Sequence, residues 1–100
     1  MEIGVGVIGA GTVGGGVIEI LSANTGVIAD KTGAQVRLRH VAELRPELLR
    51  DFDLREVTVS SSASTLIQDP SVQIVCELVG GIHPAKSFIL DALNAGKHVV

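Results

Sequence analysis

Hydrophobic and polar residues alternate along the chain in two patterns. Short runs rich in Val and Ile are typical of buried strands, and they recur between segments in which apolar residues are spaced as on one face of a helix. The runs predict five strands, at residues 3–8, 35–42, 57–59, 72–79 and 98–100. The helical spacing predicts four helices, within residues 12–24, 45–49, 65–67 and 85–94. Strands that alternate with helices in this way indicate βαβ units and a parallel sheet of the α/β class.

The second predicted strand carries charge. Strict alternation along this strand predicts two faces, one with Val36, Leu38, His40 and Ala42 and the other with Arg37, Arg39 and Val41. Because the second face is charged, we expect the helices of this chain not to cover it.

Two polar segments connect these elements. Residues 25–34 predict a loop or a frayed helical extension between the first helix and the second strand. The serines within residues 60–64 carry hydroxyl groups that suit the N-cap of the next helix, and contact with a ligand is the alternative.

A glycine-rich sequence stands directly after the first predicted strand. It fits the pattern G-x-G-x-x-G and comprises Gly9, Ala10, Gly11, Thr12, Val13 and Gly14. In dinucleotide-binding folds the first glycine permits a tight turn, the second lets the backbone approach a pyrophosphate, and the third lets the helix pack on the strand. The helix N-terminus adds free N–H groups and partial positive charge. The context therefore predicts a dinucleotide site, with a purely structural glycine turn as the alternative.

The place of this motif at the start of the chain indicates a Rossmann-type fold, a doubly wound parallel sheet with strand order 3-2-1-4-5. In this order Gly80 and Gly81 follow the strand next to the first one, at the crevice where such sheets bind ligands. We expect the two glycines near the nicotinamide ribose, and a plain strand-to-helix turn is the alternative. The fifth strand begins at residue 98, so we expect the sheet to be truncated there.

Glu43 follows the second predicted strand, where the fold expects an acidic residue that accepts hydrogen bonds from the adenosine ribose. Its carboxylate would repel a 2′-phosphate, which favours NAD over NADP. Arg45 stands two residues further on and could reverse that preference by binding the phosphate. The sequence thus predicts NAD or NADP, with NAD slightly favoured, and an exposed carboxylate without a ligand is the alternative for Glu43.

Composition excludes several classes of protein. The chain has eight Lys and Arg, eleven Asp and Glu, and two aromatic residues, so it offers no basic surface or stacking platform for nucleic acid. Its apolar runs are too short to span a bilayer and its first residues lack the basic start of a signal peptide, so we expect a cytoplasmic protein. Cys76 is the single cysteine, which excludes an internal disulfide and predicts a small core residue rather than a metal ligand.

Size limits the number of domains. A chain of 100 residues is expected to form one domain, residues 1–100, with no room for a separate substrate domain. We therefore expect a fragment of a larger enzyme.

Three segments of the chain together resemble the N-terminal nucleotide-binding domain of homoserine dehydrogenases. They are residues 7–17 (VIGAGTVGGGV), 76–85 (CELVGGIHPA) and 92–100 (ALNAGKHVV). The first is shared by many dehydrogenases, and the other two are more specific. His83 departs from the residue expected there, commonly Glu, so the resemblance assigns it no role.

The resemblance implies an NAD(P)-dependent enzyme that interconverts L-homoserine and L-aspartate 4-semialdehyde, on the route to threonine, methionine and isoleucine. The lysines that transfer protons and orient substrate in the family lie beyond residue 100, so no catalytic residue carries over and this chain alone is expected to be inactive. Lys97 matches a turn lysine of the family, and we expect it to be solvated. The full-length enzyme is expected to be a homo-oligomer.

Two alternatives remain from the sequence. One is an oxidoreductase of the Gfo/Idh type, which shares the glycine motif and the Ala-Gly-Lys-His-Val strand but usually has a Pro-Asn-His-type sequence in place of the pair Gly80 and Gly81. The other is a non-catalytic module that binds NAD(P) or senses redox state, for which a single cofactor domain is sufficient.

Overall fold

One parallel sheet organises the computed structural model, which describes residues 2–23, 33, 35–79 and 82–100, with the side chains of 23 and 82–86 left aside. Its five strands are β1 (Glu2–Ile8), β2 (Gln35–Ala42), β3 (Thr58–Ser60), β4 (Ile74–Glu77) and β5 (His98–Val99). They pair in the order β3-β2-β1-β4-β5, all parallel. The predicted Rossmann-type order is confirmed. β4 is shorter than the predicted run 72–79, because its ladders with β1 and β5 involve only residues 74–77.

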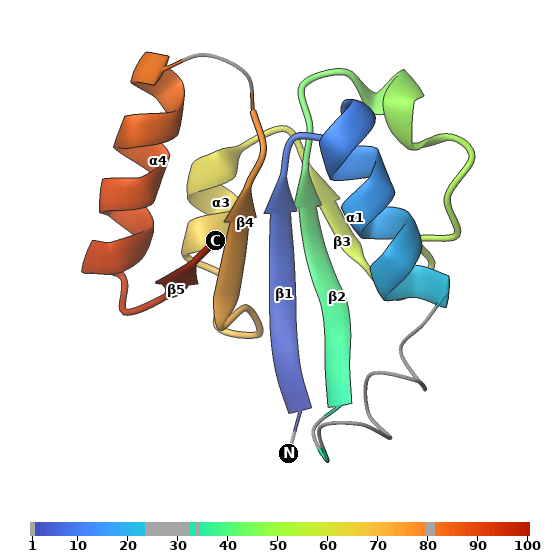
Figure 1. Cartoon of the computed structure of the whole chain (residues 1–100), viewed down its shortest axis with the longest axis horizontal. Helices are drawn as coiled ribbons and strands as arrows, with labels where there is room; N and C mark the ends of the chain where they lie inside the picture. The colour runs from blue at the N-terminus through green and yellow to red at the C-terminus, as the bar shows by residue number, and fades with distance from the viewer. Residues whose placement is uncertain (1, 24–32, 34, 80–81) are drawn as a thin grey trace.

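Helices cover both faces of this sheet. They are α1 (Thr12–Ala23), the short 3₁₀ helix η1 (Pro46–Leu49), α3 (Ala63–Ile67) and α4 (Ile82–Asn94). Figure 1 shows α1 on one face of the sheet and α3 and α4 on the other, with the carboxyl ends of the strands at the top of the view. α4 begins three residues before the predicted start, since a proline at position 84 is tolerated in the first turn of a helix.

Two apolar clusters lie on either side of the sheet. Between α1 and the sheet the fully buried side chains include Ile18 of α1, Val7 of β1 and Val41 of β2. On the opposite face Leu66 and Ile67 of α3 pack against residues of β1, β4 and α4. Each such side chain stabilises the fold by about 1.5–3 kcal/mol relative to an exposed one, so the two layers hold the strand ends in fixed positions.

The prediction of strict alternation along β2 is wrong. The register of β2 against β1 shifts between Val5 and Gly6, where Leu38 and then His40 are the partners and Arg39 is the extra residue of a β-bulge. Leu38 and Val41 therefore share the cluster under α1, while Ala42 belongs to the cluster on the α3 side. The expected charged face does not run the length of the strand.

The charged residues of β2 lie in the middle of the strand. Arg37 and Arg39 are partly exposed and both form ion pairs with Glu2 of β1. The arginines are thus paired with the neighbouring strand, and the residues of β2 after Arg39 are apolar except for His40.

Polar side chains also fix the turns around α3. Ser62 is the N-cap of α3, and its Oγ accepts a hydrogen bond from the Thr65 N–H at 3.2 Å, which confirms the predicted capping role of the serine run.

Lys97 was expected to be solvated, and this prediction is wrong. Its Nζ is partly buried and donates to the carbonyl oxygens of Asp69 and Val72, so it holds the turn before β4.

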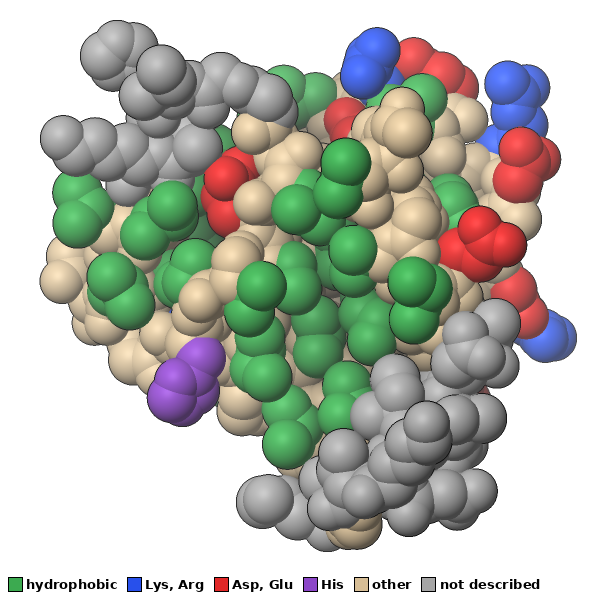
Figure 2. Space-filling view, in the orientation of Figure 1, with side chains coloured by type: hydrophobic (Ala, Val, Ile, Leu, Met, Phe, Trp, Pro, Cys, Tyr) green, Lys and Arg blue, Asp and Glu red, His purple; other side chains and the backbone are tan. Residues whose placement is uncertain are grey.

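One part of the sheet is less covered than the rest. On the α1 side of β4 the side chains of Ile74, Cys76 and Leu78 are only partly buried. Figure 2 shows hydrophobic side chains gathered over the middle of this face. Val100, directly after β5, is 77% exposed.

Candidate functional site

A cleft of about 430 Å³ opens at the carboxyl ends of the strands. Its lining comes from the turns after β1, β2 and β4, the segment before α3, and α4: Ile8, Gly9, Gly11, Ala42, Glu43, Leu44, Arg45, Ser61, Ala63, Leu78, Val79 and Phe88. This is the position at which open α/β sheets bind ligands. The cleft brings together the glycine turn, Glu43 and Arg45, which the sequence predicted as parts of one site.

The glycine turn between β1 and α1 has a geometry that other residues would disturb. Gly9 has φ +96°, a conformation that side chains disfavour. A Cβ on Gly14 would lie 1.9 Å from the Gly9 carbonyl oxygen, so α1 approaches the turn too closely for any side chain at that position. A Cβ on Gly11 would meet no atom within 4 Å, so the backbone borders open space at that point.

The first turn of α1 lies beside this open space. Thr12 and Val13 begin the helix, and the first N–H groups of an α-helix have no acceptor within it. These groups, together with the partial positive charge of the helix end, suit an anion such as a pyrophosphate. Both side chains are exposed. The open space at Gly11 and the free donors therefore fit a dinucleotide, although the individual binding roles predicted for residues 9–14 stay predictions.

Glu43 connects the ends of β1 and β2. Its Oε1 accepts a hydrogen bond of 2.6 Å from the Ala10 N–H, and its Oε2 accepts one of 3.0 Å from the Arg45 N–H. Its own N–H donates to the Ser60 carbonyl oxygen of β3 at 2.9 Å. A carboxylate offers about four lone-pair positions, so capacity remains for a hydroxyl group of a ligand after the backbone N–H groups are bound.

Glu43 is ionised at neutral pH. Partial burial raises the pKa of its carboxyl group, but the hydrogen bonds from the Ala10 and Arg45 N–H groups and the nearby Arg45 guanidinium outweigh burial and lower the pKa below its usual 4.5. The cleft therefore contains a fixed negative charge with the exposed positive charge of Arg45 beside it.

The apolar wall of the cleft was missed by the sequence reasoning. Leu44, which is 80% exposed, and Phe88 of α4 both line the cleft. Ala63 and Val79 complete this wall. Leu44 could have been suspected, since a large apolar residue between Glu43 and Arg45 breaks an otherwise polar turn. Nothing in the local sequence distinguishes Phe88 from a core residue of α4.

Some of the predicted site cannot be placed. Gly80 and Gly81 lie outside the described residues, and so does most of the predicted loop 25–34. The side chain of His83 is also outside the description. The expected position of the two glycines near the nicotinamide ribose therefore stays a prediction.

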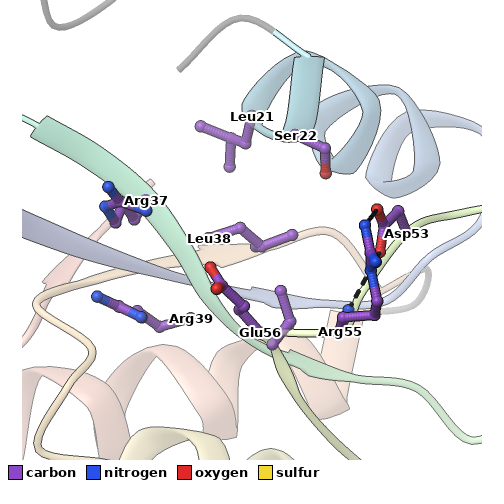
Figure 3. Close-up of a pocket in the computed structure, with 9 residues that line it drawn as sticks. Leu21, Ser22, Arg37, Leu38, Arg39, Asp53, Arg55 and Glu56 are labelled. Atoms are coloured by element: carbon purple, nitrogen blue, oxygen red, sulfur yellow. Dashed lines mark hydrogen bonds and ion pairs between the residues drawn. The ribbon is translucent and has the colours of Figure 1, made fainter. Parts of the chain in front are cut away.

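A second and larger cleft, of about 510 Å³, lies between the end of α1, the middle of β2 and the segment before β3. Figure 3 shows Arg37 and Arg39 on β2, and Asp53 and Arg55 joined by hydrogen bonds on the opposite wall. Asp53 and Arg55 satisfy each other, and the β2 arginines pair with Glu2. This cleft is away from the carboxyl ends of the strands and from the glycine turn.

The described part of the chain contains no metal-binding cluster and no helix that could span a membrane. Within it, no group of three or more His, Cys, Asp or Glu side chains is arranged to hold a metal ion. Cys76 is partly buried and packs against the cluster under α1, and burial raises the pKa of its thiol. None of the described helices is long and apolar enough to cross a membrane.

Comparison with known proteins identifies related sequences. The sequence profile of a family described as "Homoserine dehydrogenase, NAD binding domain" matches residues 9–100. The homoserine dehydrogenase of Methylobacillus glycogenes is 39% identical over 98 residues, which make up 98% of this chain and 24% of that protein. This chain thus spans about a quarter of the length of the curated relatives that it matches.

Solved structures agree with the sequence matches. The crystal structure of a homoserine dehydrogenase from Thiobacillus denitrificans has a TM-score of 0.86 and 31% identity, over 99% of this chain and 23% of that chain. The crystal structure of scyllo-inositol dehydrogenase from Lactobacillus casei, with bound cofactor NAD(H) and scyllo-inositol, has a TM-score of 0.78 and 22% identity, over 99% of this chain and 27% of that chain. The latter likeness shows a shared fold alone.

Proposed function

We propose, from the membership of this chain in the homoserine dehydrogenase family, that the cleft beside Gly11 and Glu43 binds the nicotinamide dinucleotide. The chain belongs to that family and corresponds to its NAD-binding domain. The glycine turn and the first turn of α1 receive the pyrophosphate, with Gly9, Ala10, Gly11, Thr12, Val13 and Gly14 as its surroundings. Glu43 accepts hydrogen bonds from the adenosine ribose. Gly80 and Gly81 are proposed near the nicotinamide ribose.

The observation that supports this proposal most is the bridge from Glu43 to Ala10. The 2.6 Å hydrogen bond fixes the acidic residue against the glycine turn before any ligand arrives. Preorganised groups lose little freedom on binding. The nicotinamide, when bound, supplies the hydride chemistry, and the residues of this chain bind and orient it.

We propose that NAD is preferred over NADP. The ionised carboxylate of Glu43 would repel a 2′-phosphate on the neighbouring ribose, and its hydrogen bonds to two backbone N–H groups hold it in place. Arg45 opposes this preference, because its guanidinium lines the same cleft and could bind a phosphate. The preference is therefore expected to be modest.

Separate calorimetric titrations with NADH and with NADPH test both parts of the proposal. We expect NADH to bind more tightly than NADPH. Glu43→Gln should narrow the difference by improving NADPH, while Arg45→Gln should widen it. Failure of the chain to bind either dinucleotide would refute the cofactor site, and markedly tighter binding of NADPH would refute the role of Glu43 in the preference.

The activity belongs to the whole enzyme. We propose that residues 1–100 are one domain of a longer dehydrogenase that interconverts L-homoserine and L-aspartate 4-semialdehyde, in line with relatives about four times as long. No residue of this chain is assigned a catalytic role. The purified chain should therefore bind cofactor but show no NAD(P)-dependent oxidation of L-homoserine, and turnover by it alone would contradict the proposal.

The assembly of the parent enzyme follows from the same membership. We propose a cytoplasmic homo-oligomer. The partly covered face of β4 with Ile74, Cys76 and Leu78 supports a contact with further protein, because contiguous apolar surface marks interaction sites. Light scattering of the full-length enzyme tests this, and a monomer at micromolar concentration would oppose it.

A further inference from the structure

Three polar side chains, from β2, the end of β3 and the turn before β4, form a connected group. His40 of β2 is 1% exposed, its Nδ1 lies 2.9 Å from Asp69 Oδ2, and its Nε2 lies 2.8 Å from Ser60 Oγ. Buried polar groups without partners destabilise a fold, so such a group is retained only with complete hydrogen bonding. No role described so far for the cleft uses His40 or Asp69.

The hydrogen bonds of Asp69 fix the orientation of the imidazole. Asp69 Oδ1 accepts from the Ser71 N–H at 2.8 Å and from the Ser71 hydroxyl at 2.7 Å. Although burial raises the pKa of Asp69, the bonds from Ser71 and His40 outweigh it and lower the pKa. An ionised carboxylate only accepts hydrogen bonds, so Nδ1 of His40 carries a proton and Nε2 points to Ser60.

Ser60 connects His40 to the residues of the cleft through its hydroxyl group and its carbonyl oxygen. Its single hydroxyl proton has two acceptors within reach, His40 Nε2 at 2.8 Å and the Ser62 carbonyl oxygen at 3.2 Å, and its own carbonyl oxygen accepts the Glu43 N–H at 2.9 Å. Glu43 in turn holds Ala10 at 2.6 Å. A continuous series of hydrogen bonds therefore runs from the turn before β4, across the ends of β2 and β3, to the glycine turn.

Asp, His and Ser in this order also form nucleophilic triads. Here the imidazole is almost fully buried, and the Ser62 carbonyl oxygen, 3.2 Å from Ser60 Oγ, competes for the hydroxyl proton. The geometry is that of a structural link.

We propose that His40 is a positioning residue for the dinucleotide site: with its ring oriented by Asp69, it holds Ser60, and Ser60 fixes the backbone of Glu43 against Ala10. This inference rests on the proposed function, because it assigns His40 an effect on ribose recognition. It predicts that a substitution of His40 changes the affinity for the cofactor only by changing the position of Glu43.

Two substitutions at position 40 form a matched pair. An Asn amide nitrogen lies near the place of Nδ1, so His40→Asn keeps the donor to Asp69 and loses the contact with Ser60. A Gln amide lies near the place of Nε2, so His40→Gln keeps the contact with Ser60. Both remove the same buried ring, so similar losses of global stability are expected.

The first measurement is amide hydrogen exchange in the protein without cofactor. In His40→Asn we expect the Glu43 and Ala10 amides to exchange at least about fivefold faster after correction for global stability, and in His40→Gln much less. Ile67→Val serves as a control, because it loosens the same layer without touching a polar group. Equal acceleration in all three variants, or none in His40→Asn, would overturn the proposal.

The second measurement is a double-mutant cycle on the dissociation constant of NADH. Alone, His40→Asn should weaken NADH binding about fivefold, and His40→Gln at most about twofold. Combined with Glu43→Ala, His40→Asn should add no more than about a twofold change, since its path to the ligand has been removed. Additive effects would show that His40 acts on stability alone.

The two measurements separate this inference from the proposed function. If the unmodified chain binds no NADH, the cofactor site is refuted, while the exchange experiment still decides whether His40 positions Glu43. If NADH binds and exchange at Glu43 and Ala10 does not respond to His40→Asn, the cofactor site stands and the positioning role is overturned.

Discussion

The two clefts of the molecule differ in how many of their polar groups already have partners within the protein. The larger one contains Asp53 and Arg55, which bind each other, Arg39, which binds Glu2, and Arg37, whose buried Nε lies 3.7 Å from Glu2 without a hydrogen bond. The smaller one contains an open backbone at Gly11, the first turn of α1, and a Glu43 carboxylate with lone pairs to spare. A ligand site is recognised by donors and acceptors that are held in place but incompletely used.

The turn before α1 offers the largest effect with which to test this contrast. Gly14→Ala places a Cβ 1.9 Å from the Gly9 carbonyl oxygen, so we expect a loss of about 3 kcal/mol in the free energy of unfolding. NADH binding should weaken at least about tenfold, since an affinity change of that size needs only 1.4 kcal/mol. Urea unfolding and calorimetry measure the two quantities.

Gly16→Ala is the matched control, because a Cβ there meets no atom within 4 Å. It should stabilise α1 by about 1 kcal/mol, as expected when Ala replaces Gly within a helix, and leave NADH affinity unchanged. Equal losses in the two variants would mean that the close approach at Gly14 does not matter.

The carboxylates of the two clefts provide the next comparison. Glu43→Ala should weaken NADH binding about tenfold or more, because hydrogen bonds to charged groups contribute about 1.5–3 kcal/mol. Asp53→Ala, in the larger cleft, should leave the dissociation constant within error. A shift in the NADH dissociation constant in Asp53→Ala as large as in Glu43→Ala would indicate that the ligand occupies the larger cleft instead.

Acid should weaken the contribution of Glu43 and Asp69 to the stability of the fold. Because the pKa values of Glu43 and Asp69 are lowered in the folded chain, their stabilisation is complete above the unfolded values near 4.5 and 3.8 and is lost as the pH falls through the folded values. Thermal unfolding followed from pH 6 to pH 3 should show a midpoint that falls below about pH 5. Glu43→Ala should flatten this dependence, and an unchanged slope would argue against the bridge to Ala10.

The smallest effect is expected in the larger cleft. Arg55→Gln breaks a pair in which both side chains are mostly exposed, and such pairs contribute little in water because solvent screens them. The thermal midpoint and the NADH affinity should both stay within experimental error, at low and at high salt. A clear loss of stability at low salt would show that this cleft has a structural role.

Much of the fold could be predicted from the sequence because it depends on local patterns. The Val and Ile runs at residues 3–8 and 35–42, and the GxGxxG turn that joins the first run to a helix, determine a parallel sheet with β1 at its centre. The cap at Ser62 was likewise predictable, since a serine before a short helix has few other uses. These features need only neighbours in the chain.

What could not be predicted depends on neighbours far apart in the chain. Lys97 reaches carbonyl groups 25 and 28 residues away, and nothing around it in the sequence distinguishes it from a solvated lysine. His40 looked like part of a regular strand face, yet its partners are Ser60 at the end of β3 and Asp69 in the turn before β4. At the site, Glu43 and Arg45 could be named from their place after β2, whereas Phe88 could not.

The bulge at Arg39 makes β2 one residue longer than the segment of β1 that it accompanies. An insertion within a strand ordinarily turns every later side chain to the opposite face, but here the extra residue is absorbed and both layers remain packed. A chain lacking one residue at this point could therefore keep the same core and the same position for Glu43. When this strand is aligned with another, equivalent positions have to be counted separately from each side of Arg39.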